Sequence, residues 1–207
     1  MKVIDINKWN RKLHFNHFNA LSDPYFSITI PIDVTKAYRV SKNSNISFFA
    51  KYLHDCMRAI NNVENLKYRI LDNQIVEYDV IHASPTLMRK DNTYGFSFID
   101  YNGNLDVFIK NIESEKARIE STLDLYPPKN GLDCIHCSAL PWFSFSGHKE
   151  PFSGVKDSVP KVAFSKAIES SGKLEMNVAI SVNHALADGY HISLFVDAFQ
   201  DFLNSDG

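Results

Sequence analysis

The 207-residue sequence lacks the features of membrane-spanning, secreted and nucleic-acid-binding chains. It has no apolar run of about 18 residues, so a transmembrane helix is not expected. Asp5 and Asn7 stand where a signal peptide has its apolar core, which argues against secretion by that route. The 22 Lys and Arg residues and the 24 Asp and Glu residues form no long block of one sign, so nucleic acid is not an expected partner.

Cysteine is scarce, with Cys56, Cys134 and Cys137 as the three present. An odd number of cysteines without a secretion signal predicts reduced thiols and a cytoplasmic location. Cys134 and Cys137 form a C-x-x-C pattern, but a zinc site needs two more ligands, and no second C-x-x-C or H-x-x-x-H is present. The alternating segment CIHCSALPW favours buried or half-buried strand cysteines over redox or metal ligands, and no metal is expected.

Glycine-rich phosphate motifs are also missing, since neither G-x-G-x-x-G nor G-x-x-x-x-G-K-[ST] occurs. The remaining composition, 44% hydrophobic and 22% charged, is typical of a soluble globular protein. The length suits a single domain over residues 1–207 with a sizeable core. Fifteen Phe and nine Tyr are more than such a core needs, which hints at an aromatic-lined pocket or interface.

Apolar spacing predicts helices and strands in irregular alternation. We expect helices over 6–18, 46–63, 104–124 and 190–204. Ile6, Trp9, Leu13 and Phe18 would form the apolar stripe of the first helix, and Asn45 would cap the second. We expect strands over 25–34, 66–71, 74–79, 80–88, 93–101, 134–142, 160–168 and 173–182. This pattern favours an α+β fold with a mixed β-sheet over a regular succession of βαβ units.

The segment SVNHALADGYHISLF, 181–195, carries the strongest functional signal. His184 continues the parity of the apolar residues of the preceding strand, and Asp188 follows four residues later beside Gly189, where a final helix begins. Histidine is suited to proton transfer near neutral pH, so His184 is a candidate general base. On spacing alone, however, a histidine at the core edge and a helix-capping aspartate are favoured.

Two further segments favour a catalytic role for His184 over a structural one. NKWNRKLHF at 7–15 and SALPW at 138–142 precede the H-x-x-x-D-G pattern in the chain. In this order and spacing, the three segments resemble the chloramphenicol acetyltransferase family over essentially the whole chain. H-x-x-x-D-G alone is shared with the acyltransferase cores of 2-oxo acid dehydrogenase complexes and with other CoA-dependent acyltransferases, whereas its combination with SALPW is much more specific.

The resemblance implies a two-layer α+β sandwich, with helices covering a mixed sheet, and direct transfer of acetyl from acetyl-CoA to a hydroxyl of a small molecule, chloramphenicol first. His184 would be the general base, with its tautomer held by a backbone carbonyl, and Ser138 would donate a hydrogen bond to the oxyanion. Asp188 and Arg11 would form a structural ion pair. The active enzyme would be a cytoplasmic homotrimer with its sites between subunits.

The resemblance also assigns substrate-binding positions. The acceptor pocket would be lined by Phe18, Phe26, Thr86, Tyr94 and Tyr126, and Lys166 would lie near the CoA phosphate. Taken one at a time, each of these aromatic residues is equally compatible with packing in the hydrophobic core. Lys166 is also compatible with a solvent-exposed lysine on a strand.

This sequence departs from the family pattern at several positions. Asn183 stands where the family often has a second histidine, and Phe18 stands where it commonly has a tyrosine that contacts chloramphenicol. Ala163 replaces a threonine of the family pattern, and Ala167 replaces an aromatic residue near CoA. The alternatives are therefore the same chemistry on a different alcohol or thiol, or a degenerate member that only binds a ligand. The joint presence of His184, Ser138, Asp188 and Arg11 argues against degeneration.

Overall fold

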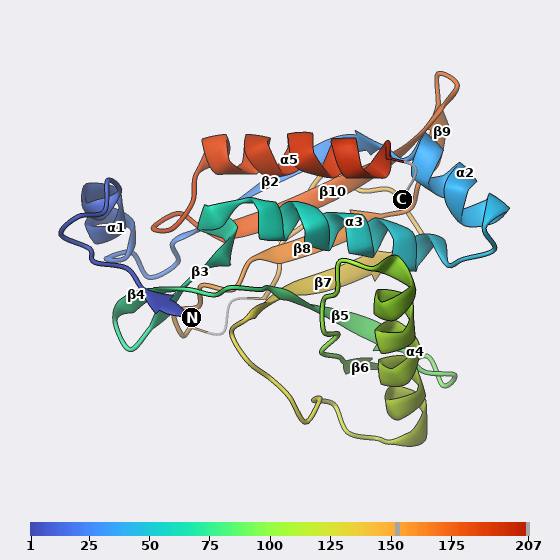
Figure 1. Ribbon diagram of the computed structural model, residues 1–207, viewed down its shortest axis with the longest axis horizontal. Helices are drawn as coiled ribbons and strands as arrows, with labels where there is room; N and C mark the ends of the chain where they lie inside the picture. Colours follow the sequence, from blue (N-terminus) through green and yellow to red (C-terminus); the bar gives the residue numbers. More distant parts are fainter. Residues whose placement is uncertain (152–153, 206–207) are drawn as a thin grey trace.

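A computed structural model describes residues 1–151 and 154–205 (Figure 1). Its helices are α1 Lys12–Phe18, α2 Thr35–Asn43, α3 Phe48–Asn62, the 3₁₀ helix η1 Glu64–Lys67, α4 Leu105–Ser121 and α5 Gly189–Leu203. Its strands are β1 Lys2–Val3, β2 Tyr25–Asp33, β3 Tyr68–Leu71, β4 Gln74–Glu77, β5 His82–Met88, β6 Tyr94–Phe96, β7 Cys134–Leu140, β8 Lys161–Ser165, β9 Ile168–Ser170 and β10 Lys173–Asn183.

The main sheet has seven strands and is mixed. Its order is β2-β10-β8-β7-β5-β6, with β9 paired to the end of β10. β5, β7 and β8 are parallel neighbours, whereas β10 is antiparallel to β2, β8 and β9. A small sheet of β1, β4 and β3 lies at one end, near α1 (Figure 1). The predicted α+β class with a mixed sheet is confirmed.

Helices α3 and α5 lie side by side across one face of the main sheet (Figure 1). Leu53, Met57 and Ile60 of α3 recur at helical spacing and are fully buried. They share one core cluster with sheet residues such as Cys137 and Val162. Because successive strand residues point to opposite faces, the residues that alternate with these face the other side of the sheet. That second face carries the pocket described below.

Two helices differ from the sequence expectation. The first was predicted over 6–18 but begins at Lys12. Of its predicted apolar stripe, Ile6, Trp9 and Phe18 pack against a small core cluster, but Leu13 is 79% exposed and Phe15 is buried in its place. Helix α2 was not predicted, because its nine residues are mostly polar and the two that it buries, Ala37 and Ser41, are small. The predicted cap of α3 is also wrong. Ser47 caps this helix by accepting a hydrogen bond from the Ala50 amide at 3.4 Å, and Asn45 adopts a positive φ of 52° in the turn before it.

The cysteines are buried free thiols, and Cys134 and Cys137 lie on β7, as the alternating pattern predicted. Burial raises the pKa of the Cys134 thiol to about 12, so it is not a reactive thiolate at neutral pH. In the described part of the chain, no cluster of three or more His, Cys, Asp or Glu side chains is arranged to hold a metal ion. The helices described there include none with the length and apolarity to span a bilayer.

Candidate active site

The turn after β10 presents His184. Its backbone amide donates to the Pro24 carbonyl at 2.8 Å. The side chain of Asn183 accepts from the Ala185 amide at 2.9 Å and donates to the Asp157 carbonyl, also at 2.9 Å. The turn is therefore tied both to itself and to the segment before β8. Asn183 therefore has a definite structural task in this chain.

Helix α1 holds His184 from two sides. The Phe18 ring, at the end of α1, is stacked on the His184 ring with centroids 3.9 Å apart and planes inclined by 5°. Arg11, at the start of α1, donates from Nη2 to the His184 carbonyl at 3.3 Å. Phe26 of β2 adds a tilted contact, with ring centroids 4.4 Å apart.

The His184 Nδ1 atom is buried and has no hydrogen-bond partner among the residues described. The expectation that a backbone carbonyl would hold the tautomer is therefore not met. Instead, the flat contact with Phe18 and the tilted contact with Phe26 restrict the plane of the imidazole.

Asp188 and Arg11 form an ion pair between the Asp188 carboxylate and Arg11 Nη1. The same carboxylate caps α5 by accepting from the Tyr190 amide at 3.1 Å, and it contacts His191 Nδ1 at 2.8 Å. Burial alone would raise the pKa of Asp188, but the hydrogen bond and charge of Arg11 outweigh it and lower the pKa to about 2. Asp188 thus acts on His184 only indirectly, because Arg11 lies between this carboxylate and the His184 carbonyl.

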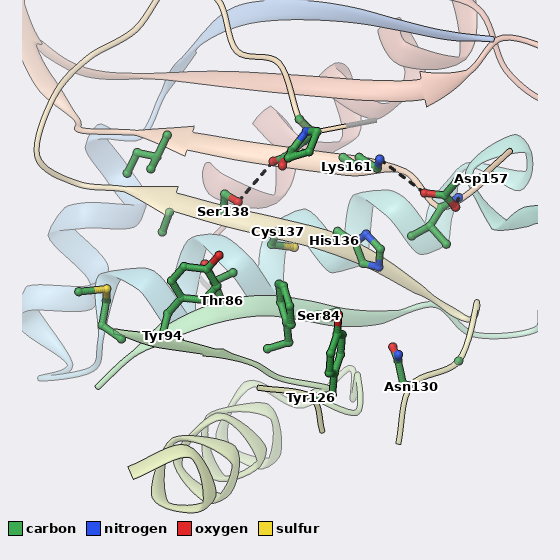
Figure 2. Close-up of a pocket in the computed structure, with 18 of the residues that line it drawn as sticks. Ser84, Thr86, Tyr94, Tyr126, Asn130, His136, Cys137, Ser138, Asp157 and Lys161 are labelled. Atoms are coloured by element: carbon green, nitrogen blue, oxygen red, sulfur yellow. Dashed lines mark hydrogen bonds and ion pairs between the residues drawn. The ribbon is translucent and has the colours of Figure 1, made fainter. Parts of the chain in front are cut away.

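Ser138 belongs to a different place, a pocket of about 990 Å³ on the face of the sheet opposite α3 and α5 (Figure 2). Thr86, Tyr94 and Tyr126, which the resemblance assigns to the acceptor pocket, line this pocket too. Ala163 of β8 pairs in register with Ser138 of β7. The Ser138 hydroxyl donates to the Glu150 carboxylate at 3.4 Å, so an oxyanion would have to displace Glu150 to receive that hydrogen bond.

The predicted site residues therefore fall into two groups within one chain. Phe18, Phe26, Arg11 and Asp188 surround His184, which does not line the pocket, whereas Thr86, Tyr94 and Tyr126 accompany Ser138. Lys166 belongs to neither group. It is exposed after the end of β8, where its backbone amide donates to the Phe143 carbonyl at 3.0 Å.

Sequence reasoning missed several pocket residues. They are Ser84, His136, Trp142, Glu150 and Lys161. The signal for His136 was available, because it lies two residues before Ser138 on the same strand and so shares its face. Ser84 and Lys161 could not be found in this way, since only the pairing of β5 and β8 with β7 brings them there.

A mixed sheet with one helical layer is also the fold of solved acetyltransferases. A solved chloramphenicol acetyltransferase, 28% identical, matches it with a TM-score of 0.86 over 98% of this chain and 99% of that one. A dihydrolipoamide acetyltransferase from Azotobacter vinelandii has the same fold, with a TM-score of 0.69 and 15% identity over 93% of this chain and 86% of that one.

Residues 1–200 match the family model described as chloramphenicol acetyltransferase, and the chain belongs to that family. Chloramphenicol acetyltransferase from Campylobacter coli is 29% identical over 97% of each chain. Chloramphenicol acetyltransferase 3 from Escherichia coli is 26% identical over 97% of this chain and 96% of its own length. The predicted family, fold class and acyltransferase class are confirmed.

Proposed function

We propose that this enzyme transfers the acetyl group of acetyl-CoA to a hydroxyl of chloramphenicol, in a homotrimer whose sites lie between subunits. The observation that carries this proposal is the separation of the two predicted groups. His184 and its aromatic neighbours lie apart from the Ser138 pocket within one chain, so a complete site needs the His184 group of one subunit and the Ser138 pocket of another.

The chemistry is direct transfer. His184 takes the proton of the acceptor hydroxyl while the hydroxyl oxygen attacks the thioester carbonyl of acetyl-CoA. The oxyanion that forms accepts a hydrogen bond from Ser138, which turns away from Glu150 to provide it. When the tetrahedral intermediate collapses, the carbon–sulfur bond breaks, and the CoA sulfur receives the proton held by His184. Ser138 is not acylated at any stage.

Assembly in a closed ring is compatible with the edges of the main sheet. Among the strands that the structure describes, β2 is an edge strand that pairs with β10 alone. It carries Phe26, which contacts His184, and Ile28, which is 36% exposed. A neighbouring subunit packed along β2 would cover this edge and bring its own pocket toward His184.

Three further assignments belong to this proposal. Lys166, which is exposed after β8, would contact a CoA phosphate. Chloramphenicol would contact Phe18 and Phe26 of one subunit and Thr86, Tyr94 and Tyr126 of the next. The buried reduced cysteines support a location in the cytoplasm.

The test is CoA thiol release from acetyl-CoA, followed with a thiol reagent in the presence and absence of chloramphenicol. The protein thiols should give little background because all three are buried. Release that depends on chloramphenicol supports the proposal. Release with another alcohol or thiol, but not with chloramphenicol, would support acetyl transfer as the reaction and refute chloramphenicol as the acceptor. No release with any acceptor would favour a catalytically degenerate member.

A further inference from the structure

The Asp188 carboxylate has more partners than its ion pair with Arg11. Its Oδ2 atom faces Arg11 Nη1. Its Oδ1 atom accepts from the Tyr190 amide at 3.1 Å and lies 2.8 Å from Nδ1 of His191. His191 is the third residue of α5, a helix that packs on the main core cluster through its apolar face. The imidazole therefore approaches the carboxylate from a firmly packed element.

The position of Arg11 depends on this carboxylate. The Arg11 side chain is 9% exposed, and its Nε atom has no hydrogen-bond partner among the residues described. Its guanidinium is held through Nη1 by Asp188 and through Nη2 by the His184 carbonyl, at 3.3 Å. A rotation of the carboxylate would therefore move Arg11 and, through it, the turn that carries His184.

Nδ1 of His191 lies between two groups with opposite requirements. The Asp188 carboxylate can only accept a hydrogen bond, whereas the Asp188 amide, 3.2 Å from Nδ1, can only donate one. The carboxylate is the closer of the two, and a bare nitrogen there would face its lone pairs, so Nδ1 carries a hydrogen.

The charge of His191 is consistent with this tautomer. Desolvation lowers the pKa of His191, with the charge of Asp188 acting against this effect and that of Arg11 adding to it. At neutral pH the imidazole is therefore uncharged and has one hydrogen to donate. A hydrogen bond to a carboxylate is stronger than one between neutral groups, so this donor restrains the orientation of Asp188.

We propose that His191 is a positioning residue for the proposed base: its Nδ1–H orients the Asp188 carboxylate toward Arg11, and Arg11 holds the His184 carbonyl. This inference rests on the proposed function and adds a residue of α5 to its machinery. His191 acts through two intervening side chains, so its loss should lower kcat and leave the binding of both substrates nearly unchanged.

The experiment compares His191→Phe with His191→Asn in the CoA-release assay. Phenylalanine keeps a ring but cannot donate, whereas asparagine lacks the ring but can place an N–H at the position of Nδ1. Because misplacing a catalytic group by about 1 Å can cost about 10²-fold, kcat should fall by up to that factor in His191→Phe. His191→Asn should keep most of the wild-type kcat. The matched control is His14→Phe, since His14 is an exposed histidine of α1.

A role in packing alone would give the opposite order, because phenylalanine fills the space of the imidazole and asparagine does not. Higher kcat in His191→Phe than in His191→Asn, or wild-type kcat in His191→Phe, would overturn the inference. In an Asp188→Asn background, adding His191→Phe should cost little more, because the chain of contacts is already broken there. Costs that add fully in the double variant would also refute it.

Nitrogen-15 NMR of the imidazoles tests the inference without turnover. The His191 signals, assigned by their loss in His191→Asn, should show the hydrogen on Nδ1 near pH 7. The His184 signals, assigned through His184→Ala, should shift in His191→Phe and shift less in His191→Asn. These results would support the inference even if no acceptor releases CoA. A hydrogen on Nε2 alone, or His184 signals unchanged in His191→Phe, would refute it whatever the outcome of the activity assay.

Discussion

The ring of Phe18 lies flat on the ring of His184, with the two centroids 3.9 Å apart. Because His184 Nδ1 has no hydrogen-bond partner in the described part of the chain, this stacking replaces the usual carbonyl or carboxylate that fixes a catalytic imidazole. Phe18 and Arg11 stand at opposite ends of α1 and hold the side chain and the carbonyl of the same histidine. This short helix therefore positions the proposed base.

Replacing His184 with alanine should remove proton transfer while leaving the fold intact. General-base catalysis contributes typically about 10²- to 10⁴-fold, so acetyl transfer should fall by at least that factor. The measurement is CoA release by His184→Ala, with circular dichroism and the oligomeric mass as controls for folding. Near-normal turnover in a well-folded His184→Ala protein would disprove the assignment of the base.

The Asp188–Arg11 pair should contribute stability that depends on pH. The pKa of Asp188 is lowered from 3.8 in the unfolded chain to about 2 in the folded one, so the folded state favours the carboxylate. The stabilisation is present above about pH 4 and is lost as the pH falls toward about 2. It amounts to at most about 2 kcal/mol, because Asp188 is partly solvent-exposed.

Asp188→Asn tests this expectation. The variant should melt at a lower temperature than the wild type at pH 7, and the difference should shrink as the pH is lowered toward 2. Activity should fall as well, because Arg11 loses the partner that holds it near the His184 carbonyl. Abolished activity with an unchanged melting temperature would instead indicate that Asp188 takes part directly in the chemistry.

The two-group arrangement predicts that inactive variants can complement each other. Trimers mixed from equal amounts of His184→Ala and Ser138→Ala subunits should regain about a quarter of wild-type activity, since random mixing leaves that share of intersubunit sites intact. Each variant alone supplies the baseline, and light scattering should give a trimer of 23.6 kDa chains. A fully active monomer, or no recovery in proven mixed trimers, would refute the shared site.

Local patterns predicted much of the fold. Helix α3 and strand β10 carry strong apolar periods, so the sequence located both and placed His184 at the strand exit. Helix α2 was missed because it is short and mostly polar, and the two residues that it buries, Ala37 and Ser41, are small. The start of α1 was placed too early because Ile6 and Trp9 pack against a second, smaller core cluster outside the helix.

The site was harder to predict than the fold. The motif resemblance indicated His184 and Ser138, but their separation within one chain depends on the three-dimensional arrangement of distant segments. The alignment of Ser84, His136 and Lys161 across the sheet depends on the pairing of β5, β7 and β8. Local periodicity carries no information about such long-range register, so Ser84 and Lys161 could not be brought next to His136 from the sequence.

The last prediction concerns the acceptor. Phe18 stands where family members that acetylate chloramphenicol commonly have a tyrosine, so this chain should bind the drug with a raised KM. Phe18→Tyr should lower that KM by about 2- to 12-fold, the value of one hydrogen bond between neutral groups. The added hydroxyl lies in the plane of the ring and leaves the stacking on His184 free to persist, so kcat should change little. Steady-state kinetics with chloramphenicol as the varied substrate separate the two constants, and the KM for acetyl-CoA serves as the control. An unchanged KM in Phe18→Tyr would show that other pocket residues recognise the acceptor.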